Sequence, residues 1–243
     1  MKNETYLSQL DEDNVHITTR PYLNKVLKHT NPYEVDVLGT SITILPGVMS
    51  PEYDWAGLYM IDCLPENLQG KHVLELGPGS GLVSVFAGLR GAASITCDDI
   101  NPEAVKNTEL NLKKYNIKSE VFLSNVFSNI PKNKYDIIIF NLPYHNGVPR
   151  NDLEKGVIDA EYNAMIQFFA EANNYLKESG TLYAGFSRSG DVSLLMEHIQ
   201  KNGFKVDTFE EKNSYEKVER FVGQDFHYNC QVYTLSHNNN ATS

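Results

Sequence analysis

Strand-like and helix-like segments alternate regularly from Lys71 onward, and this alternation restricts the possible folds more than any other feature. Short runs rich in β-branched and aromatic residues have the length of strands, and amphipathic segments with helical spacing separate most of them. Parallel strands need crossover connections, which are usually helices, so the alternation predicts an α/β protein with a Rossmann-like, doubly wound, mostly parallel sheet. The expected strands are residues 72–77, 94–99, 120–125, 136–141 and 181–187, followed by a terminal pair at 204–212 and 229–237. The expected helices are residues 81–91, 101–116, 160–179 and 192–203.

The chain divides at about Gly70 into an N-terminal extension and a main domain. Residues 1–70 contain a helical stretch, two alternating runs that predict a hairpin, and a loop that leads into a short helix. Residues 71–236 carry the alternating pattern and form the main domain. The polar tail, residues 237–243, is low in complexity and is expected to be disordered.

Charge and composition bear on the class of partner and on location. The net charge is −10, and basic residues form no cluster larger than a pair. Proteins that grip a nucleic acid backbone usually carry a basic face, so the balance argues against nucleic acid and favours a small molecule or a protein as partner. No apolar run approaches the ~18 residues of a membrane span, and the N-terminal segment lacks a secretion signal, so we expect a cytoplasmic protein without membrane association. The three cysteines have no CxxC spacing, and no metal site is expected.

A glycine-rich turn follows the first strand of the main domain. In VLELGPGSG, Gly77, Gly79 and Gly81 permit a tight turn and allow a ligand to approach the backbone without obstruction by a Cβ atom. The spacing differs from the G-x-G-x-x-G turn that cradles a pyrophosphate. Glu75, two residues earlier, would repel a pyrophosphate but could pair with a cationic amino group.

An acidic residue ends the second strand at an informative interval. Asp99 lies 22 positions beyond Gly77, where a carboxylate can accept hydrogen bonds from both hydroxyls of a ribose. Acidic residues also begin loops for structural reasons, so this signal depends on the glycine turn that precedes it. The neighbouring Asp98 would point to the opposite face of the strand and is expected to be a solvated charge.

These residues resemble the first two motifs of the class I S-adenosylmethionine-dependent methyltransferases, in which E-x-G-x-G-x-G ends the first strand and a ribose-binding acid ends the second. The resemblance covers residues 71–236. It implies a seven-stranded sheet with an antiparallel last strand, and S-adenosylmethionine as the cofactor. It also implies that Glu75 and the three glycines contact the methionine portion and that Asp99 binds the ribose. The further cofactor-binding residues that it implies are Ile100, Asn125, Val126, Phe127 and Asn141, with Asn125 where the family often has an acid.

The fourth strand leads directly into NLPY, which is similar to the N-x-P-Y motif of methyltransferases that modify a nitrogen attached to a planar system. The lone pair of such a nitrogen is delocalised, so the nitrogen is a poor nucleophile until it rehybridises. The Asn141 side-chain oxygen and the Leu142 carbonyl can accept hydrogen bonds from the amino group and localise charge on nitrogen. Pro143 fixes the turn, and Tyr144 offers a π face to the substrate and to the developing positive charge. Asn141, Pro143 and Tyr144 are therefore the predicted catalytic residues, although a turn proline and a packing tyrosine would explain the same residues without catalysis.

The segment ITILPGVMSPEYDWAG precedes the main domain and is similar to the P-G-V-F-S segment of guanine-N2 ribosomal RNA methyltransferases. By position it is also similar to the lead-in of the release-factor glutamine methyltransferases. In those families the segment covers the cofactor, so Met49, Tyr53 and Trp55 are candidates to line the site. Packing in the core is an equal alternative for Trp55.

The resemblance implies a methyltransferase that acts on an amide or amino nitrogen of a small molecule or a protein side chain. Two other reactions stay open. One is transfer of a different alkyl carbon from S-adenosylmethionine, or its cyclisation, with methylthioadenosine as the product; the other is N-methylation of a ribosomal RNA base. A non-catalytic binding protein is a third alternative, against which the intact motifs argue. The sequence does not identify the acceptor, the oligomeric state or the role of the loop 212–225.

Overall fold

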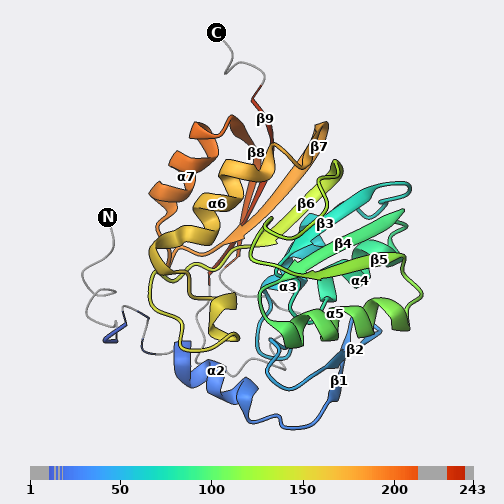
Figure 1. The fold of residues 1–243 in the computed structure, drawn as a ribbon, viewed down its shortest axis with the longest axis vertical. Helices are drawn as coiled ribbons and strands as arrows, with labels where there is room; N and C mark the ends of the chain where they lie inside the picture. The colour runs from blue at the N-terminus through green and yellow to red at the C-terminus, as the bar shows by residue number, and fades with distance from the viewer. Residues whose placement is uncertain (1–10, 14, 16, 18, 213–228, 239–243) are drawn as a thin grey trace.

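The computed structural model describes residues 11–13, 15, 17, 19–212 and 229–238. Within this part of the chain, a seven-stranded sheet has the order β5-β4-β3-β6-β7-β9-β8 (Figure 1). The first five strands in that order are parallel, and β9 pairs antiparallel with both β7 and β8. The predicted doubly wound sheet with an antiparallel last strand is therefore confirmed. Its strands are β3 (His72–Leu76), β4 (Ser94–Asp99), β5 (Ser119–Leu123), β6 (Tyr135–Asn141), β7 (Leu176–Phe186), β8 (Phe204–Lys212) and β9 (Cys230–His237).

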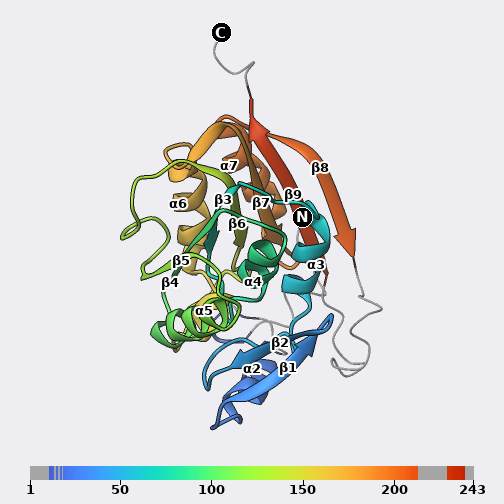
Figure 2. The ribbon, with the colours of Figure 1, turned by 90° about the vertical axis from the view of Figure 1, so that its right-hand side faces the viewer.

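Helices cover both faces of the sheet, with α3, α4 and α5 on one face and α6 and α7 on the other (Figures 1 and 2). Side chains alternate along each strand, so β3 and β6 contribute to both cores. Val73 and Ile137 pack with residues of α3 and α4, whereas Leu74 and Ile138 pack with residues of α6 and α7. The helices are α3 (Ala56–Cys63), α4 (Leu82–Leu89), α5 (Pro102–Lys114), α6 (Asn163–Ala172) and α7 (Val192–Lys201). None of the helices in the described residues is both long and apolar enough to cross a membrane.

The N-terminal extension contains α2 (Thr19–Leu27) and the predicted hairpin of β1 (Tyr33–Val37) and β2 (Thr40–Ile44). Leu38 and Gly39 both have positive φ, 53° and 79°, as a two-residue type I′ turn requires. The hairpin lies beside α5 (Figure 1).

Two fully buried asparagines of α5 join the hairpin to the glycine turn. The Asn111 side chain accepts from the Thr43 backbone nitrogen at 3.0 Å, and the Asn107 side chain accepts from the Leu45 nitrogen at 2.6 Å. Both amides also donate to the carbonyl of Ser80, at 2.8 and 3.2 Å respectively. The same pair of side chains therefore fixes the turn that bears the glycine motif and the segment that leads from the hairpin to the site.

Two boundaries differ from the sequence prediction. The helix expected over residues 160–179 is limited to α6, because η2 (Ala160–Tyr162) precedes it and β7 already begins at Leu176. Glu161 and Tyr162 have positive φ, 55° and 56°, which interrupts the helix on its N-terminal side. At the other end of the chain, β9 continues through His237, the first residue of the expected disordered tail, while residues 239–243 lie outside the described part.

Candidate active site

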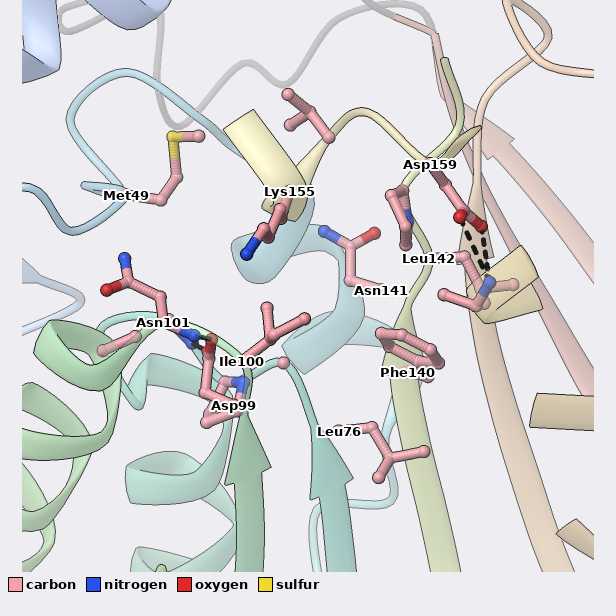
Figure 3. Close-up of a pocket in the computed structure, with 18 of the residues that line it drawn as sticks. Met49, Leu76, Asp99, Ile100, Asn101, Phe140, Asn141, Leu142, Lys155 and Asp159 are labelled. Atoms are coloured by element: carbon pink, nitrogen blue, oxygen red, sulfur yellow. Dashed lines mark hydrogen bonds between the residues drawn. The ribbon is translucent and has the colours of Figure 1, made fainter. Parts of the chain in front are cut away.

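A pocket of about 370 Å³ opens at the carboxyl ends of β3, β4 and β6. This is the edge at which doubly wound sheets bind ligands. Strand ends and the turns after them form one side, and the loop after β2 and the β6–α6 connection form the rest. Figure 3 shows Asp99 and Ile100 on one side of the pocket and Asn141 on the other, with Met49 and Lys155 above Asp99 and Ile100 in this view.

The glycine turn contributes to the pocket in the way the motif predicts, with one difference. Gly77 and Gly79 line the pocket and have φ values of 61° and 58°, so a side chain at either position would strain the backbone. Gly81 has φ 78° but does not line the pocket. A Cβ atom on Gly81 would lie 3.1 Å from the Cα atom of Thr108, so this glycine allows α4 to pack closely on α5.

Two acids hold defined positions beside the turn. Glu75 is 5 % exposed and accepts from the Ser84 hydroxyl, and burial raises the pKa of its carboxyl to about 7. Asp99 accepts from the backbone nitrogens of Gly79, at 3.1 Å, and Asn101, at 2.9 Å. Burial raises the pKa of Asp99 to about 6, against the lowering effect of these hydrogen bonds. The two carboxyls therefore bind backbone or hydroxyl donors on one side and still line the pocket.

The expectation that Asp98 is a solvated charge is wrong. Its side chain does point to the other face of β4, but that face is covered, and Asp98 is 2 % exposed. Asp98 is one of the residues that line the pocket, as are Ser124 and Val126. Burial, followed by the nearby charge of Asp99, raises its pKa well above the ordinary value.

The predicted cofactor-binding residues of the segment after β5 lie partly in the pocket and partly in the core. Asn125 and Val126 line the pocket together with Ile100 from the turn after β4. Phe127 does not. It is stacked on Tyr175, with ring centroids 4.4 Å apart, and belongs to the core on the α6 side. The sequence prediction that Phe127 contacts the cofactor therefore finds no support in the packing.

The NLPY residues all line the pocket. Asn141 is the last residue of β6 and lies opposite Gly185 in the register with β7. The backbone nitrogen of Leu142 donates to the Gly185 carbonyl at 3.0 Å, which fixes the start of the turn. Tyr144 is 8 % exposed, and its ring lies 4.4 Å from that of His145. His145 itself is excluded from the lining and pairs through Nε2 with the Thr19 hydroxyl at 3.0 Å, so it joins α2 to this loop.

The loop before the main domain is only partly in the site. Met49 lines the pocket. Tyr53 and Trp55 do not: the Tyr53 hydroxyl lies 2.7 Å from Nε2 of His29, and Trp55 is buried in the core beside Tyr59. For Trp55 the packing alternative therefore fits the structure.

Sequence reasoning missed the wall formed by the β6–α6 connection. Residues 152, 153 and 155–160 and three residues in the first half of α6 line the pocket, and η1 (Glu154–Gly156) lies within this segment. Its polar groups include Lys155, which pairs with Asp152 at 2.7 Å. Asp159 accepts from the backbone nitrogens of Ala164 and Met165, at 2.9 and 3.2 Å, and so caps α6. The signal for this wall was weak, since its only sequence feature is an irregular, polar stretch after the motif.

A buried ion cluster fastens this wall to the N-terminal extension. Arg20 of α2 pairs with Glu154 at 3.2 Å, with Asp13 at 3.0 Å and with Asp11. The Arg20 and Glu154 side chains are 12 % and 7 % exposed. Because Glu154 also accepts from the backbone nitrogen of Arg150 at 2.7 Å, the cluster fixes the position of η1 above the pocket.

Removing the arginine should destabilise the protein measurably. Arg20→Met leaves a buried carboxylate at Glu154 without its cation, so we expect a loss of about 2–3 kcal/mol in the free energy of unfolding, measured by urea denaturation. Arg188→Met serves as the matched control, because Arg188 pairs with Glu211 while remaining 63 % exposed. The loss in the free energy of unfolding for Arg188→Met should stay below about 1 kcal/mol. Equal losses in the two variants would mean that the buried cluster contributes no more than a surface pair.

The comparisons with known proteins agree with this geometry. A family model described as "Methyltransferase small domain" matches residues 39–218. The chain therefore belongs to this family. The predictions of an S-adenosylmethionine-dependent methyltransferase, and of S-adenosylmethionine as its cofactor, are confirmed.

Two relatives and one solved structure illustrate the range of similar proteins. The chain is 31 % identical over 184 residues to a "Putative protein N5-glutamine methyltransferase" from Methanocaldococcus jannaschii, with 71 % of this chain and 89 % of that protein covered. It is 32 % identical to "Ribosomal RNA small subunit methyltransferase C" from Psychromonas ingrahamii, with 63 % of this chain but only 41 % of that protein covered. The fold is also similar to that of a Thermus thermophilus 16S rRNA N2 G1207 methyltransferase solved with AdoMet and guanosine, at a TM-score of 0.55 and 20 % identity. That alignment covers 85 % of this chain and 50 % of the other.

These relatives correct one inference from charge. Some of them are named for ribosomal RNA and one for protein glutamine, so the expectation that nucleic acid is an unlikely partner receives no support. The acidic net charge describes the whole surface and not the area around the pocket.

Proposed function

We propose that this protein transfers the methyl group of S-adenosylmethionine to a planar amide or amino nitrogen, with protein glutamine as the favoured acceptor class. The observation that carries the proposal is that Asn141, at the end of β6, lines the same pocket as Glu75 and Asp99. The preference for protein glutamine rests on the share of each relative's length that the alignment covers. The alignment spans 89 % of the relative named for glutamine but 41 % of the ribosomal RNA relative.

The order of strands supports a proposed arrangement of the cofactor along the pocket. β6, β3, β4 and β5 lie side by side in that order, and their carboxyl ends form one edge. Asn141 ends β6, Glu75 and Gly77 belong to β3 and its turn, and Asp99 ends β4. A ligand that spans this edge would place its amino acid portion at β3 and its ribose hydroxyls at Asp99. Its base would then lie at the β4–β5 end and its sulfonium towards Asn141.

The residues around Asn141 suit attack by a weakly nucleophilic nitrogen. When bound, S-adenosylmethionine supplies an electrophilic methyl group on a sulfonium centre. The Asn141 carboxamide oxygen accepts a hydrogen bond from the acceptor's amino group, and this bond strengthens as the nitrogen gains positive charge. The Tyr144 ring stabilises the same charge and gives the planar group a surface on which to lie. The methylated nitrogen is acidic enough to lose its proton to water.

Two measurements test the reaction and the acceptor class separately. Incubation with S-adenosylmethionine and a cell extract should form S-adenosylhomocysteine; formation of methylthioadenosine would instead indicate transfer of another alkyl group or cyclisation. With a labelled methyl group, the label should enter macromolecules and become soluble after protease treatment. Release by ribonuclease would assign the activity to RNA and overturn the glutamine proposal.

Cofactor binding should depend on pH because of the two raised carboxyl pKa values. Glu75, with a pKa of about 7, and Asp99, with a pKa of about 6, are both partly neutral in mildly acidic solution. Ionised carboxylates bind an ammonium group and ribose hydroxyls better, so binding should release protons and the affinity should rise with pH. Between pH 7.5 and 5.5 we expect the affinity for S-adenosylhomocysteine to fall at least about tenfold, measured by isothermal titration. Glu75→Gln should bind more weakly at pH 7.5 and show a flatter pH profile; an unchanged slope would exclude Glu75 as the titrating group.

A further inference from the structure

Asp98 is a buried acid that the proposed mechanism does not use. It pairs with Leu76 in the parallel register of β4 with β3, and its carbonyl accepts from the Gly77 nitrogen at 2.8 Å. The side chain is 2 % exposed, and its Oδ1 atom has no hydrogen-bond partner among the described residues. An unsatisfied buried polar atom is destabilising, so such an atom in a folded protein calls for an explanation.

The other acids of the pocket are different. Glu75 accepts from Ser84, Asp99 from two backbone nitrogens, and Asp159 from the first turn of α6. Three further buried side-chain atoms in the described residues also have no partner, on Tyr33, Tyr135 and Asn173, but none of these residues lines the pocket. Of the four residues with such an atom, Asp98 is therefore the one that lines the pocket.

The protonation state of Asp98 determines what it can bind. Burial and the adjacent Asp99 raise its pKa well above the ordinary value, which favours the neutral form of this carboxyl. A neutral carboxyl group presents one hydrogen-bond donor and one acceptor side by side. It therefore suits a planar group that has an amino donor next to a ring nitrogen acceptor.

The position of Asp98 along the sheet indicates which part of the ligand it meets. It lies on β4 and lines the pocket with Ser124, Asn125 and Val126 from the segment after β5, at the end of the edge farthest from Asn141. In the proposed arrangement this end receives the base. We propose that Asp98 is a specificity-determining residue that recognises adenine, accepting from the exocyclic 6-amino group and donating to a neighbouring ring nitrogen. This inference rests on the proposed function, because it takes the ligand to be an adenine nucleoside.

The test compares ligands that differ only in the 6-amino group. We would measure the affinities of S-adenosylhomocysteine and its 6-deamino purine analogue for the wild type, Asp98→Asn and Asp98→Leu. The wild type should prefer the amino compound by about tenfold or more, as for a hydrogen bond to a buried group. Asp98→Asn keeps a donor and an acceptor and should retain the preference. In Asp98→Leu the ratio of the affinities for the two ligands should fall to near one.

A second readout does not depend on ligand binding. Asp98→Leu removes an unsatisfied buried polar atom, so the ligand-free variant should unfold at a temperature equal to or about 2–4 °C above that of the wild type. Its stabilisation by S-adenosylhomocysteine should be smaller. A variant that loses stability without ligand would instead assign Asp98 a structural role and overturn the inference.

The outcomes separate this inference from the function on which it rests. If the wild type and Asp98→Leu bind S-adenosylhomocysteine with the same preference for the amino group, Asp98 does not recognise the base, and the proposed function stands. If the preference disappears in Asn125→Leu and persists in Asp98→Leu, Asn125 recognises the amino group and the inference is overturned. Failure of the wild type to bind S-adenosylhomocysteine would overturn both.

Discussion

Asn141→Ala should lower kcat by about 10²–10³-fold while the dissociation constant for S-adenosylhomocysteine changes less than about threefold. The reason is that the Asn141 carboxamide contributes mainly when charge develops on the acceptor nitrogen, and this charge is absent in the ground state. The residue ends β6 and lines the pocket, so its loss removes a positioned acceptor without opening the core. Single-turnover kinetics and isothermal titration measure the two quantities separately.

Two further variants sharpen this result. Tyr144→Phe keeps the ring and should retain most of the activity, because the proposed contribution of Tyr144 comes from its π face. Asn141→Asp is nearly isosteric and keeps the acceptor oxygen, with a second oxygen in place of the amide nitrogen. It brings a negative charge close to the sulfonium, so it should bind the cationic cofactor more tightly than it binds S-adenosylhomocysteine. If Asn141→Ala weakened cofactor binding as much as turnover, Asn141 would be a binding residue and not a residue specific to the transfer step.

The fold could be predicted because each element carries its own periodic signal. The apolar runs of β3 and β6 are buried on both faces, as expected for central parallel strands, and Asn101 caps α5 ahead of Pro102 as the sequence indicates. The first part of β7, from Leu176 to Gly180, escaped prediction because its residues continue the spacing of α6. Its pairing with Tyr135 in the sheet decides its conformation, and local propensity does not report such long-range pairing.

Some residues of the candidate site could likewise be predicted from the sequence, and others could not. Glu75, Asp99 and Asn141 were predictable because each ends a parallel strand or lies just before its end, and parallel strands bring these ends to one edge. Asp98 was placed on the correct face of β4 but in the wrong environment, because alternation gives the direction of a side chain and not what covers it. Phe127 was predicted to contact the cofactor but lies in the core, for the related reason that the chain turns sharply at Val126, whose φ is 51°.

Long-range polar contacts were the least predictable part. Asn107 on α5 is a polar residue on a predicted helix, where an exposed position would be the ordinary expectation. Its role in fixing the glycine turn depends on the hairpin, which is more than 60 positions away in the chain. The same holds for Arg20 and Glu154, which are 134 positions apart. Neither contact has a local sequence signal.

Gly185→Ala should reduce kcat by about 100-fold although residue 185 contacts neither ligand in the proposed arrangement. A Cβ atom on Gly185 would lie 2.5 Å from the Asn141 Oδ1 atom and 3.2 Å from its Cα atom. Because the first distance is shorter than real Cβ contacts and the second is tight, the carboxamide must move, and a displacement of about 1 Å at a positioned group can cost about 10²-fold in rate. The Met60 Cε atom would lie 3.1 Å away, but it is the end of a flexible side chain and can shift.

The matched control is Gly180→Ala in the same strand. There a Cβ atom would lie 2.7 Å from Leu176 Cδ1 and 2.9 Å from the Lys177 carbonyl oxygen, so the steric conflict is similar but its neighbours are not site residues. Both variants should lose about 1–3 kcal/mol in the free energy of unfolding, as overpacking does. Only Gly185→Ala should lose turnover in the fraction that remains folded. Equal losses of turnover would mean that β7 transmits general strain to the site.

A double-mutant cycle isolates the contact that this argument requires. In the Asn141→Ala background the carboxamide is absent, so the added methyl group of Gly185→Ala should change kcat by less than about threefold. The combined variant would then be no slower than Asn141→Ala alone, and the difference from additivity would equal nearly the whole effect of the single Gly185 substitution. Additive losses would show that Gly185→Ala acts through the Leu142 turn, whose nitrogen donates to the Gly185 carbonyl, and not through the Asn141 side chain.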